Sequence, residues 1–257
     1  MKQLPGVLIQ AGDLTNLTYC SELLANADGV IHCAGVSRVS SAKNAPLDAM
    51  QSTMLASGNL FETIRNQGNK WLVVVSTREV ENQSITKEPN TLEDLYGICK
   101  TTVEQLARCF CLGAGTPLVI CRLSDVYGSP SDHANKLLPV FLTRSLAGSP
   151  LEIRDTTTRF CFTHINDVVT GISEAVEQLE TGKVTFQLRK IWGDRWVTAP
   201  ELAQLIKKTF ASESEHVVSP PTLRDKIEAT ADDALTWNFT ETISLEEGIK
   251  QMSGFRG

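Results

Sequence analysis

The sequence predicts an α/β protein in which a parallel β-sheet is wrapped by helices. Short apolar runs of strand length alternate with longer segments whose apolar residues recur at steps of three and four, the pattern of strands joined by helices. The chain has 257 residues, of which 42% are hydrophobic, enough for one large domain or a main domain with a smaller lobe. We therefore expect a doubly wound parallel sheet followed by a smaller, mostly helical lobe.

Four apolar runs are predicted as strands of the main sheet. They cover residues 7–10, 30–34, 71–76 and 118–123. A helix is predicted between the second and third strands, over residues 46–66, with Pro46 near its start and Gly68 after its end. The next predicted helix, residues 92–111, turns an apolar stripe inward and carries Tyr96 and Lys100 beside that stripe, where a crevice could form.

The pattern changes after residue 130 to helices with short extended pieces between them. Helices are predicted over residues 135–147, 165–180, 199–210 and 244–252, with Thr198 and either Thr242 or Ser244 as caps of the last two. We therefore divide the chain into a main domain, residues 1–130, and a lobe, residues 131–257. Within the lobe, residues 155–190 are expected to return to the main sheet.

Composition excludes several classes of function. The formal net charge is −6 and no segment gathers lysine and arginine, which argues against a nucleic-acid partner. The longest apolar runs are strand-sized and the N-terminus lacks a signal-peptide core, so we expect a cytoplasmic protein without a membrane anchor. The seven cysteines are expected to be reduced core thiols, with neither a metal site nor a disulfide framework; those inside apolar segments are Cys33, Cys99, Cys121 and Cys161.

Tyr96 and Lys100 form the pair with the clearest chemistry. Residues four apart share a helix face, and a lysine beside a tyrosine favours the phenolate, which could take a proton from a substrate hydroxyl. Alcohol oxidation by a nicotinamide needs such a base. This four-residue spacing alone is weak evidence for a catalytic pair, because solvated helix faces produce it by chance. The motifs around it make the identification specific.

Those motifs, taken in order, resemble the extended short-chain dehydrogenase/reductase family, the NAD-dependent epimerases and dehydratases of nucleotide sugars. The resemblance covers nearly the whole chain and implies a Rossmann-like fold. It rests on residues 12–15 (Gly-Asp-Leu-Thr), 30–35 (Val-Ile-His-Cys-Ala-Gly), 75–77 (Val-Ser-Thr), Tyr96 with Lys100, 122–128 (Arg-Leu-Ser-Asp-Val-Tyr-Gly) and 244–249 (Ser-Leu-Glu-Glu-Gly-Ile).

The resemblance also implies roles for individual residues. Tyr96 would deprotonate a sugar hydroxyl as hydride passes to NAD or NADP, Thr77 would hydrogen-bond the same oxygen, and Lys100 would hold the nicotinamide ribose. Glu79 is a candidate catalytic base. The expected cofactor contacts are Asp13, Leu14, His32, Ala34, Gly35, Val75, Tyr96 and Lys100, and the expected substrate contacts are Arg78, Ser124 and Arg159.

The sequence departs from the family pattern at its start. Members begin with a strand, a Gly-rich turn, a helix and a second strand, whereas the motifs here begin at the family's third strand. We therefore expect an N-terminally truncated fold with weak dinucleotide affinity, either natural or the product of a trimmed gene. Residues 7–10 are expected to pair beside residues 30–34, or that edge is expected to be covered by a homodimer or a full-length relative.

Thr77-Arg78-Glu79 bears on the reaction type. Sugar dehydratases carry an acid or small polar residue between threonine and glutamate, whereas Arg78 cannot donate a proton at working pH. We therefore favour epimerisation or simple oxidoreduction at a sugar carbon over dehydration. The alternative is a catalytically impaired scaffolding subunit that pairs with a full-length relative. Arg159 stands one position before the place where the family has its nucleotide-binding arginine, which Phe160 occupies.

Overall fold

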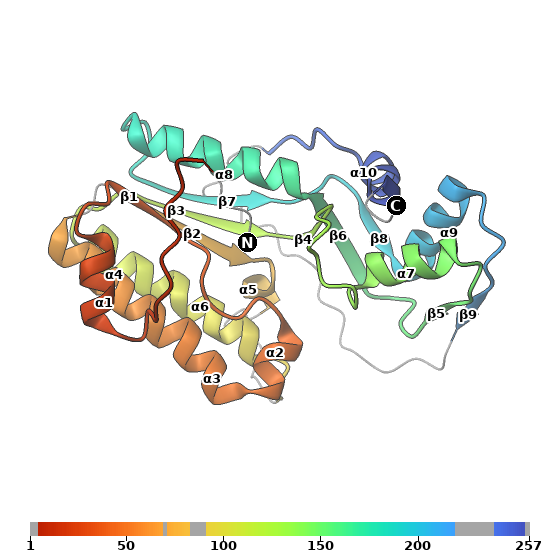
Figure 1. Ribbon diagram of the computed structural model, residues 1–257, viewed down its shortest axis with the longest axis horizontal. Helices are drawn as coiled ribbons and strands as arrows, with labels where there is room; N and C mark the ends of the chain where they lie inside the picture. Colours follow the sequence, from red (N-terminus) through yellow and green to blue (C-terminus); the bar gives the residue numbers. More distant parts are fainter. Residues whose placement is uncertain (1–4, 69–70, 83–90, 219–238, 255–257) are drawn as a thin grey trace.

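A parallel sheet forms the centre of the computed structural model, which describes residues 5–68, 71–82, 91–218 and 239–254. Within these residues the sheet has the order β1-β2-β3-β7, and every neighbouring pair is parallel. Its strands are β1 (Gly29–His32), β2 (Trp71–Thr77), β3 (Leu118–Leu123) and β7 (Phe186–Ile191). Helices cover both faces (Figure 1), so the predicted doubly wound α/β sheet is confirmed.

Alternation along β2 explains why the sheet is covered on both sides. Leu72 and Val74 face one layer, while Trp71 and Val73 face the other, because successive side chains of a strand point to opposite faces. The first layer is made by α1 (Leu17–Leu24), α4 (Ala56–Gln67) and α6 (Leu95–Ala107), and the second by α8 (Ile165–Glu180). Burial on both faces accounts for the near-continuous apolar sequence of β2 and β3.

The helical run between β1 and β2 begins and ends at the predicted residues. It consists of α3 (Pro46–Met50), a π-helical turn η1 (Gln51–Leu55) and α4, with Pro46 in the first turn and Gly68 closing the run at a φ of 70°. Shorter helices α2 (Val39–Asn44) and α5 (Glu79–Asn82) follow β1 and β2.

Helix α6 begins at Leu95, three residues later than predicted. Thr91 and Asp94 form a turn before it, in which the Thr91 amide and hydroxyl donate to the Asp94 carboxylate at 3.2 Å. Side-chain bonds of this kind compete with helical backbone bonds and favour a turn. At its other end α6 continues into a π-helical turn, η2 (Arg108–Leu112).

A smaller lobe is built beyond β3 around its own apolar core. Its strands are β4 (Asp125–Tyr127), β6 (Arg159–His164) and β8 (Trp196–Thr198) in one sheet, and β5 (Leu151–Ile153) with β9 (His216–Val218) in another. Its helices are α7 (Leu137–Leu146), α9 (Ala199–Phe210) and α10 (Leu245–Ser253). Between the strands of the lobe, α8 and β7 return to the main sheet, where β7 pairs with β3.

The caps of the last two lobe helices agree with the sequence. Thr198 forms a capping box with Glu201 at the start of α9, and of the two residues predicted for the next helix Ser244 caps α10. The hydroxyl and amide of Thr242, the other residue, donate to the carboxylate of Asp167 in the first turn of α8. The capping atom of α8 is Nδ1 of His164, which accepts from the amide of Asn166.

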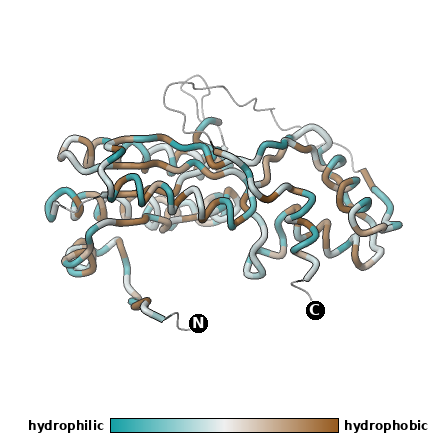
Figure 2. The backbone as a smooth tube through the Cα atoms, turned by 90° about the horizontal axis from the view of Figure 1, so that it is seen from above, coloured by the Kyte–Doolittle hydropathy of each residue, from teal (hydrophilic) through white to brown (hydrophobic). Residues whose placement is uncertain are grey.

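Residues 7–10 do not form the predicted strand. They lie outside the sheet, leaving β1 as an edge, with Val7 49%, Leu8 88% and Ile9 53% exposed. Figure 2 shows the N-terminal stretch standing apart from the layered body. The physical reason lies in the following residues: Asn59 of α4 donates to the carbonyls of Leu14 and Thr15, which ties the chain to the helix layer and away from β1.

The expectation of core thiols holds for five of the seven free cysteines. Cys33 and Cys109 are exposed, because the first lies beyond the end of β1 and the second on the outer side of η2. Among the described helices, none combines the length and the apolar character needed to cross a bilayer.

Candidate active site

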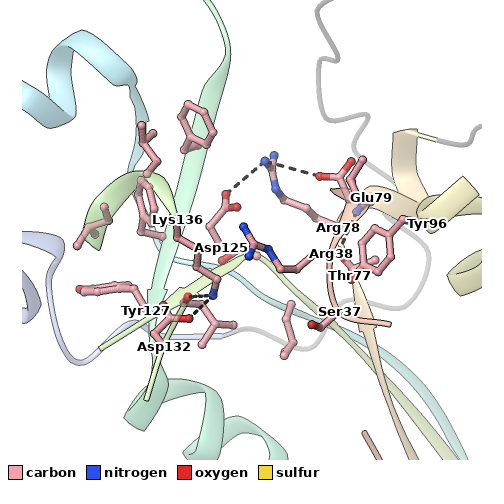
Figure 3. A pocket seen from close by; sticks show the side chains of 18 of the residues that line it. Ser37, Arg38, Thr77, Arg78, Glu79, Tyr96, Asp125, Tyr127, Asp132 and Lys136 are labelled. Carbon is pink, nitrogen blue, oxygen red and sulfur yellow. Dashed lines mark hydrogen bonds and ion pairs between the residues drawn. The ribbon is translucent and has the colours of Figure 1, made fainter. Parts of the chain in front are cut away.

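A cavity of about 490 Å³ opens where the main sheet meets the lobe. It lies beyond the C-terminal ends of β2 and β3, the place where open parallel sheets bind their ligands. Figure 3 shows polar side chains from both parts of the molecule converging on it. The cavity is lined from the main sheet by Cys33, Val75, Thr77, Arg78, Glu79, Tyr96 and Lys100, and toward the lobe by Arg38, Ser124, Asp125, Tyr127, Asp132, Asn135 and Lys136, among others.

Thr77 is held at the last position of β2. Its strand pairs with β3 through Leu123, so its side chain has a fixed place at the sheet's edge. The Thr77 hydroxyl accepts a hydrogen bond from the amide of Glu79 at 3.3 Å, which starts the short helix α5. The residue is 9% exposed.

Tyr96 lies in the first turn of α6, against Thr77. Its side chain is 8% exposed, and burial raises the pKa of the phenol, while a side-chain hydrogen bond with Thr77 lowers it. The carboxylates of Glu79 and Asp125 raise the pKa further, because they disfavour a second negative charge. In this arrangement burial holds the pKa of the phenol above its ordinary value, and the effect of Lys100 on the phenol stays a prediction.

Lys100 lies one helical turn after Tyr96 and is 7% exposed. Its ammonium donates to the Val75 carbonyl at 3.3 Å, which directs it toward the end of β2. Burial lowers the pKa of Lys100, while Cys33, Glu104 and Cys99 raise it. Burial is the larger influence, so the net effect is a lowered pKa for the ammonium at the edge of the cavity.

Arg78 spans the cavity between the main sheet and the lobe (Figure 3). Its guanidinium lies 3.2 Å from the Asp125 carboxylate of β4 and 3.8 Å from that of Glu79. It also stacks over Trp196 of β8, 5.6 Å from the ring centroid. Burial raises the pKa of Asp125, and Arg78 opposes that effect.

Four polar cavity residues were not predicted from the sequence: Arg38, Asp132, Asn135 and Lys136. Lys136 lies 2.7 Å from Asp132, and Arg38 donates to the side-chain oxygen of Asn135 at 2.7 Å. Arg38 comes from the loop after β1, whereas Lys136 immediately precedes α7. In the sequence, Arg38 and Lys136 are marked only as basic residues beside a helix start, a feature that many surface helices share. Arg38 also lies 97 residues from Asn135, its hydrogen-bond partner.

The expected cofactor residues are divided between the cavity and its surroundings. Val75, Tyr96 and Lys100 line the cavity, whereas Asp13, Leu14, His32, Ala34 and Gly35 do not. The ring of His32 is buried beneath α4, with Nε2 2.8 Å from the Ser57 hydroxyl and its edge against Phe61. Burial, followed by the charge of Lys100, lowers the pKa of His32 to about 4.

The remaining expected cofactor residues lie before α1 or beyond β1. The Asp13 carboxylate accepts from the Thr15 amide at 2.9 Å, and the Leu14 carbonyl is held by Asn59. Ala34 is exposed, and Gly35 has a φ of +115°, where an added Cβ would come within 3.1 Å of Thr53.

Of the expected substrate residues, Arg78 and Ser124 line the cavity and Arg159 does not. The Ser124 hydroxyl lies 2.5 Å from that of Thr163. Arg159 is exposed on β6, opposite Thr198 at the start of α9, where its charge helps to lower the pKa of Glu201.

The donor set at the sheet end fits the ribose of a dinucleotide better than a metal ion. A phenol, a hydroxyl and an ammonium offer hydrogen bonds to sugar oxygens, and Gly35 leaves the backbone after β1 free of a side chain. The described residues contain no group of three or more histidine, cysteine or carboxylate side chains able to hold a metal ion.

Comparisons with known proteins identify relatives with this fold and the family of the chain. Residues 2–188 match the model of the NAD dependent epimerase/dehydratase family. The chain is 28% identical over 145 residues to a dTDP-glucose 4,6-dehydratase of Mycobacterium tuberculosis and 26% identical over 218 residues to one of Streptomyces antibioticus. These matches cover 53% and 80% of this chain, but 43% and 62% of the relatives.

The fold is shared with the UDP-glucose 4-epimerase of Thermotoga maritima, whose structure was solved with UDP-glucose. The TM-score is 0.78 at 20% sequence identity, over 98% of this chain and 85% of the epimerase. The family match extends from the N-terminal residues to β7 and so includes the whole cavity floor. The chain belongs to the NAD-dependent epimerase/dehydratase family.

Proposed function

We propose that the protein is an NAD(P)-dependent oxidoreductase that acts on a hydroxyl-bearing carbon of a nucleotide sugar. The observation that carries this proposal is the convergence of Thr77, Tyr96 and Lys100 on one cavity at the end of β2. The three side chains come from two different elements, yet all are less than 10% exposed and border the same space. Relatives named as dTDP-glucose dehydratases support the substrate class.

The proposed chemistry follows from the order of the three groups. Tyr96 Oη would accept the proton of the substrate hydroxyl while the carbon loses hydride, and Thr77 would hold the same oxygen. The bound nicotinamide would accept that hydride and return it. Lys100 would hold the ribose of the dinucleotide through its ammonium and, once its own charge is brought beside the phenol, stabilise the phenolate. Because burial raises the pKa of the phenol in the chain without ligand, ligand binding would have to bring about this activation.

The opposite end of the cavity suits an anionic group. Arg38 and Lys136 approach it from the main domain and the lobe, and only Lys136 is paired there with a carboxylate, that of Asp132. Two cations facing one carboxylate leave an excess of positive charge, which favours the diphosphate of a nucleotide sugar. A diphosphate at this end would place the sugar toward Thr77 and Tyr96.

Arg78 favours epimerisation or simple oxidoreduction over dehydration. Loss of water from a sugar needs a group that protonates the departing hydroxyl, and arginine stays charged at every working pH. The Asp125 carboxylate is engaged with Arg78 at 3.2 Å, so the arginine is fixed beside the place where the sugar would lie. Glu79, which lies 3.8 Å from Arg78, is the candidate base in either reaction.

The test is calorimetric titration of the 257-residue chain with NAD+ and NADP+, followed by nucleotide sugars in the presence of the dinucleotide that binds. Saturable binding of a dinucleotide and turnover of UDP- or dTDP-glucose would support the proposal. A folded chain that binds neither dinucleotide would overturn it. The Lys136→Met variant serves as a matched control, because it should weaken the binding of the nucleotide sugar while leaving the binding of the dinucleotide unchanged.

A second candidate is a subunit that pairs with a related chain through the edge of the main sheet. The observation that favours it is the exposure of β1, where Ile31 is 46% exposed and no other described strand pairs on its outer side. Sedimentation equilibrium distinguishes this candidate, since it requires a dimer or a complex. A chain that is monomeric at micromolar concentration and turns over a nucleotide sugar by itself would exclude this candidate.

A further inference from the structure

Helix α6 carries a third buried ionisable side chain in line with the proposed catalytic pair. Tyr96, Lys100 and Glu104 follow one another at four-residue steps, so they share one face of the helix. They are 8%, 7% and 6% exposed. The proposed reaction uses the first two, and a buried carboxylate without a role in it calls for an explanation.

Glu104 is bound to both central strands of the sheet. The Ser76 hydroxyl donates to Glu104 Oε1 at 2.5 Å. Arg122 donates through Nε to Oε1 at 3.1 Å and through Nη2 to Oε2 at 2.8 Å, a two-pronged contact that fixes the carboxylate's orientation. Ser76 precedes Thr77 on β2 and pairs with Arg122 on β3. The face of α6 that carries Tyr96, Lys100 and Glu104 is therefore hydrogen-bonded to the strand that carries Thr77.

The network of ion pairs around Glu104 also includes residues of α5 and β7. Arg122 Nη1 lies 3.2 Å from Glu81 Oε1 of α5, and Lys190 Nζ of β7 lies 2.9 Å from the same oxygen. Lys190 also lies over the ring of Trp192, whose Nε1 donates to the Arg122 carbonyl at 3.0 Å. Two cations and two carboxylates thus join α5, α6, β3 and β7 beneath the cavity.

We propose that Glu104 and Arg122 are positioning residues that fix the rotation of α6, and thereby place Tyr96 against Thr77 and Lys100 at the end of β2. This inference rests on the proposed function of those three residues. Glu104 does not line the cavity; it acts through the helix that it shares with Tyr96 and Lys100.

A small rotation would have a large effect. A side-chain tip lies roughly 6 Å from a helix axis, so a rotation of about 10° moves it by about 1 Å. A misplacement of that size costs roughly 100-fold in rate when reacting groups must meet in one geometry. The two-pronged contact of Arg122 resists such a rotation, because turning the helix would break both bonds at once.

The charge of Glu104 gives a second, measurable link to Lys100. The groups that influence Lys100 are Cys33 beyond β1, Cys99 and Glu104 on its own helix, and His32 of β1. Glu104 raises the pKa of Lys100 and so opposes the effect of burial. Removing its charge should lower the pKa of Lys100, because burial would then act with less opposition.

The kinetic test compares three variants with the wild type. Glu104→Gln and Arg122→Lys keep the shape of the pair but weaken its contacts, and the double variant E104M/R122M replaces it with two apolar side chains. We expect kcat to fall 10- to 100-fold in all three, with KM changed less than twofold. The double variant should regain thermal stability, since it leaves no unpaired buried charge, without regaining kcat.

Gln178→Ala is the matched control. Gln178 accepts from Arg189 at 2.7 Å, so this variant also disturbs a buried arginine, but on α8 and β7, away from the cavity. It should lower stability while leaving kcat unchanged. A kcat loss in the Glu104 and Arg122 variants no greater than that of Gln178→Ala would show that the network is merely structural and would overturn the inference.

A measurement that needs no turnover separates this inference from the proposed function. In chain labelled with 13C-lysine, the Lys100 Cε resonance, assigned with Lys100→Arg, is followed through a pH titration. Its midpoint should lie lower in Glu104→Gln than in the wild type and be unchanged in Gln178→Ala. An unchanged midpoint in Glu104→Gln overturns the inference, whereas an inactive wild type with a shifted midpoint overturns only the proposed reaction.

Discussion

The guanidinium of Arg78 lies 3.2 Å from the carboxylate of Asp125 and joins the end of β2 to β4 across the cavity. The pair is half-buried: burial raises the pKa of Asp125, and the Cys161 backbone amide contributes a hydrogen bond to its carboxylate. Trp196 covers the guanidinium from β8. An arginine held by a carboxylate and an indole ring therefore occupies the position between Thr77 and Glu79, where the resemblance to sugar dehydratases implies an acid or small polar residue.

We predict that the chain does not dehydrate its substrate. When nucleotide sugars are incubated with it and NAD+, mass spectrometry should show products of unchanged mass or of hydrogen loss, and none lighter by one water. Arg78→Lys is the control, because lysine keeps the charge but has a proton that it can lose. A dehydrated product from the wild type would contradict the role given to Arg78 and point to another acid.

Replacing Tyr96 with phenylalanine should abolish turnover and leave the fold intact. The substitution removes one oxygen from a side chain whose ring packs with the apolar residues around Ala42 and Ala49, so the packing is retained. General acid–base groups contribute roughly 100-fold or more to rate, so we expect a fall in kcat of at least that size. Rate assays and thermal unfolding check the two halves of the prediction. Retained activity with unchanged stability would refute the catalytic role of the phenol.

The main sheet could be predicted because its inner strands are buried on both faces. The runs 71–75 and 118–121 are continuously apolar, and α9 begins at the cap predicted for it, Thr198. Residues 7–10 carry the same apolar signal without becoming a strand. Apolar composition does not say which neighbour a segment meets, and here Asn59 draws the following turn to α4.

The cavity shows the same limit. Tyr96 and Lys100 were identifiable from their spacing on one turn of a predicted helix, and Thr77 from the family resemblance of residues 75–77. Asp125 and Arg38 were not, since each gains its place through a contact made in three dimensions, with Arg78 and Asn135 respectively. Charged residues that reach a cavity only through such contacts carry no local signal that sets them apart from surface charges.

His32 should make the protein sensitive to mild acid. Its pKa is about 4 in the folded chain, because burial disfavours the charged ring, against about 6.5 when the chain is unfolded. The unfolded state therefore binds more protons between these values, and stability falls as the pH falls through this window. The expected loss is about 3 kcal/mol between pH 7 and pH 4.

Urea unfolding of the wild type and of His32→Gln between pH 4 and pH 7 isolates this contribution. Glutamine can keep the bond that His32 makes with Ser57 and does not titrate. The difference in unfolding free energy between the two proteins should change with pH, in favour of the variant at acid pH. A difference that is independent of pH would show that His32 is not buried as described.

Cys33 should report on ligand binding. It is exposed and lines the cavity, whereas Cys109 is exposed on η2, away from it. Burial of part of the thiol raises the pKa of Cys33, so its reaction with a disulfide reagent should be slow at pH 7 and accelerate as the pH rises.

In the folded chain Cys33 and Cys109 should react and the five buried cysteines should not. Saturating dinucleotide or nucleotide sugar should then protect Cys33 and leave Cys109 reactive, as peptide mapping of the labelled chain would show. Equal protection of both would mean that the ligand binds elsewhere or that the whole chain tightens on binding, and either result would contradict the placement of the site beyond β2.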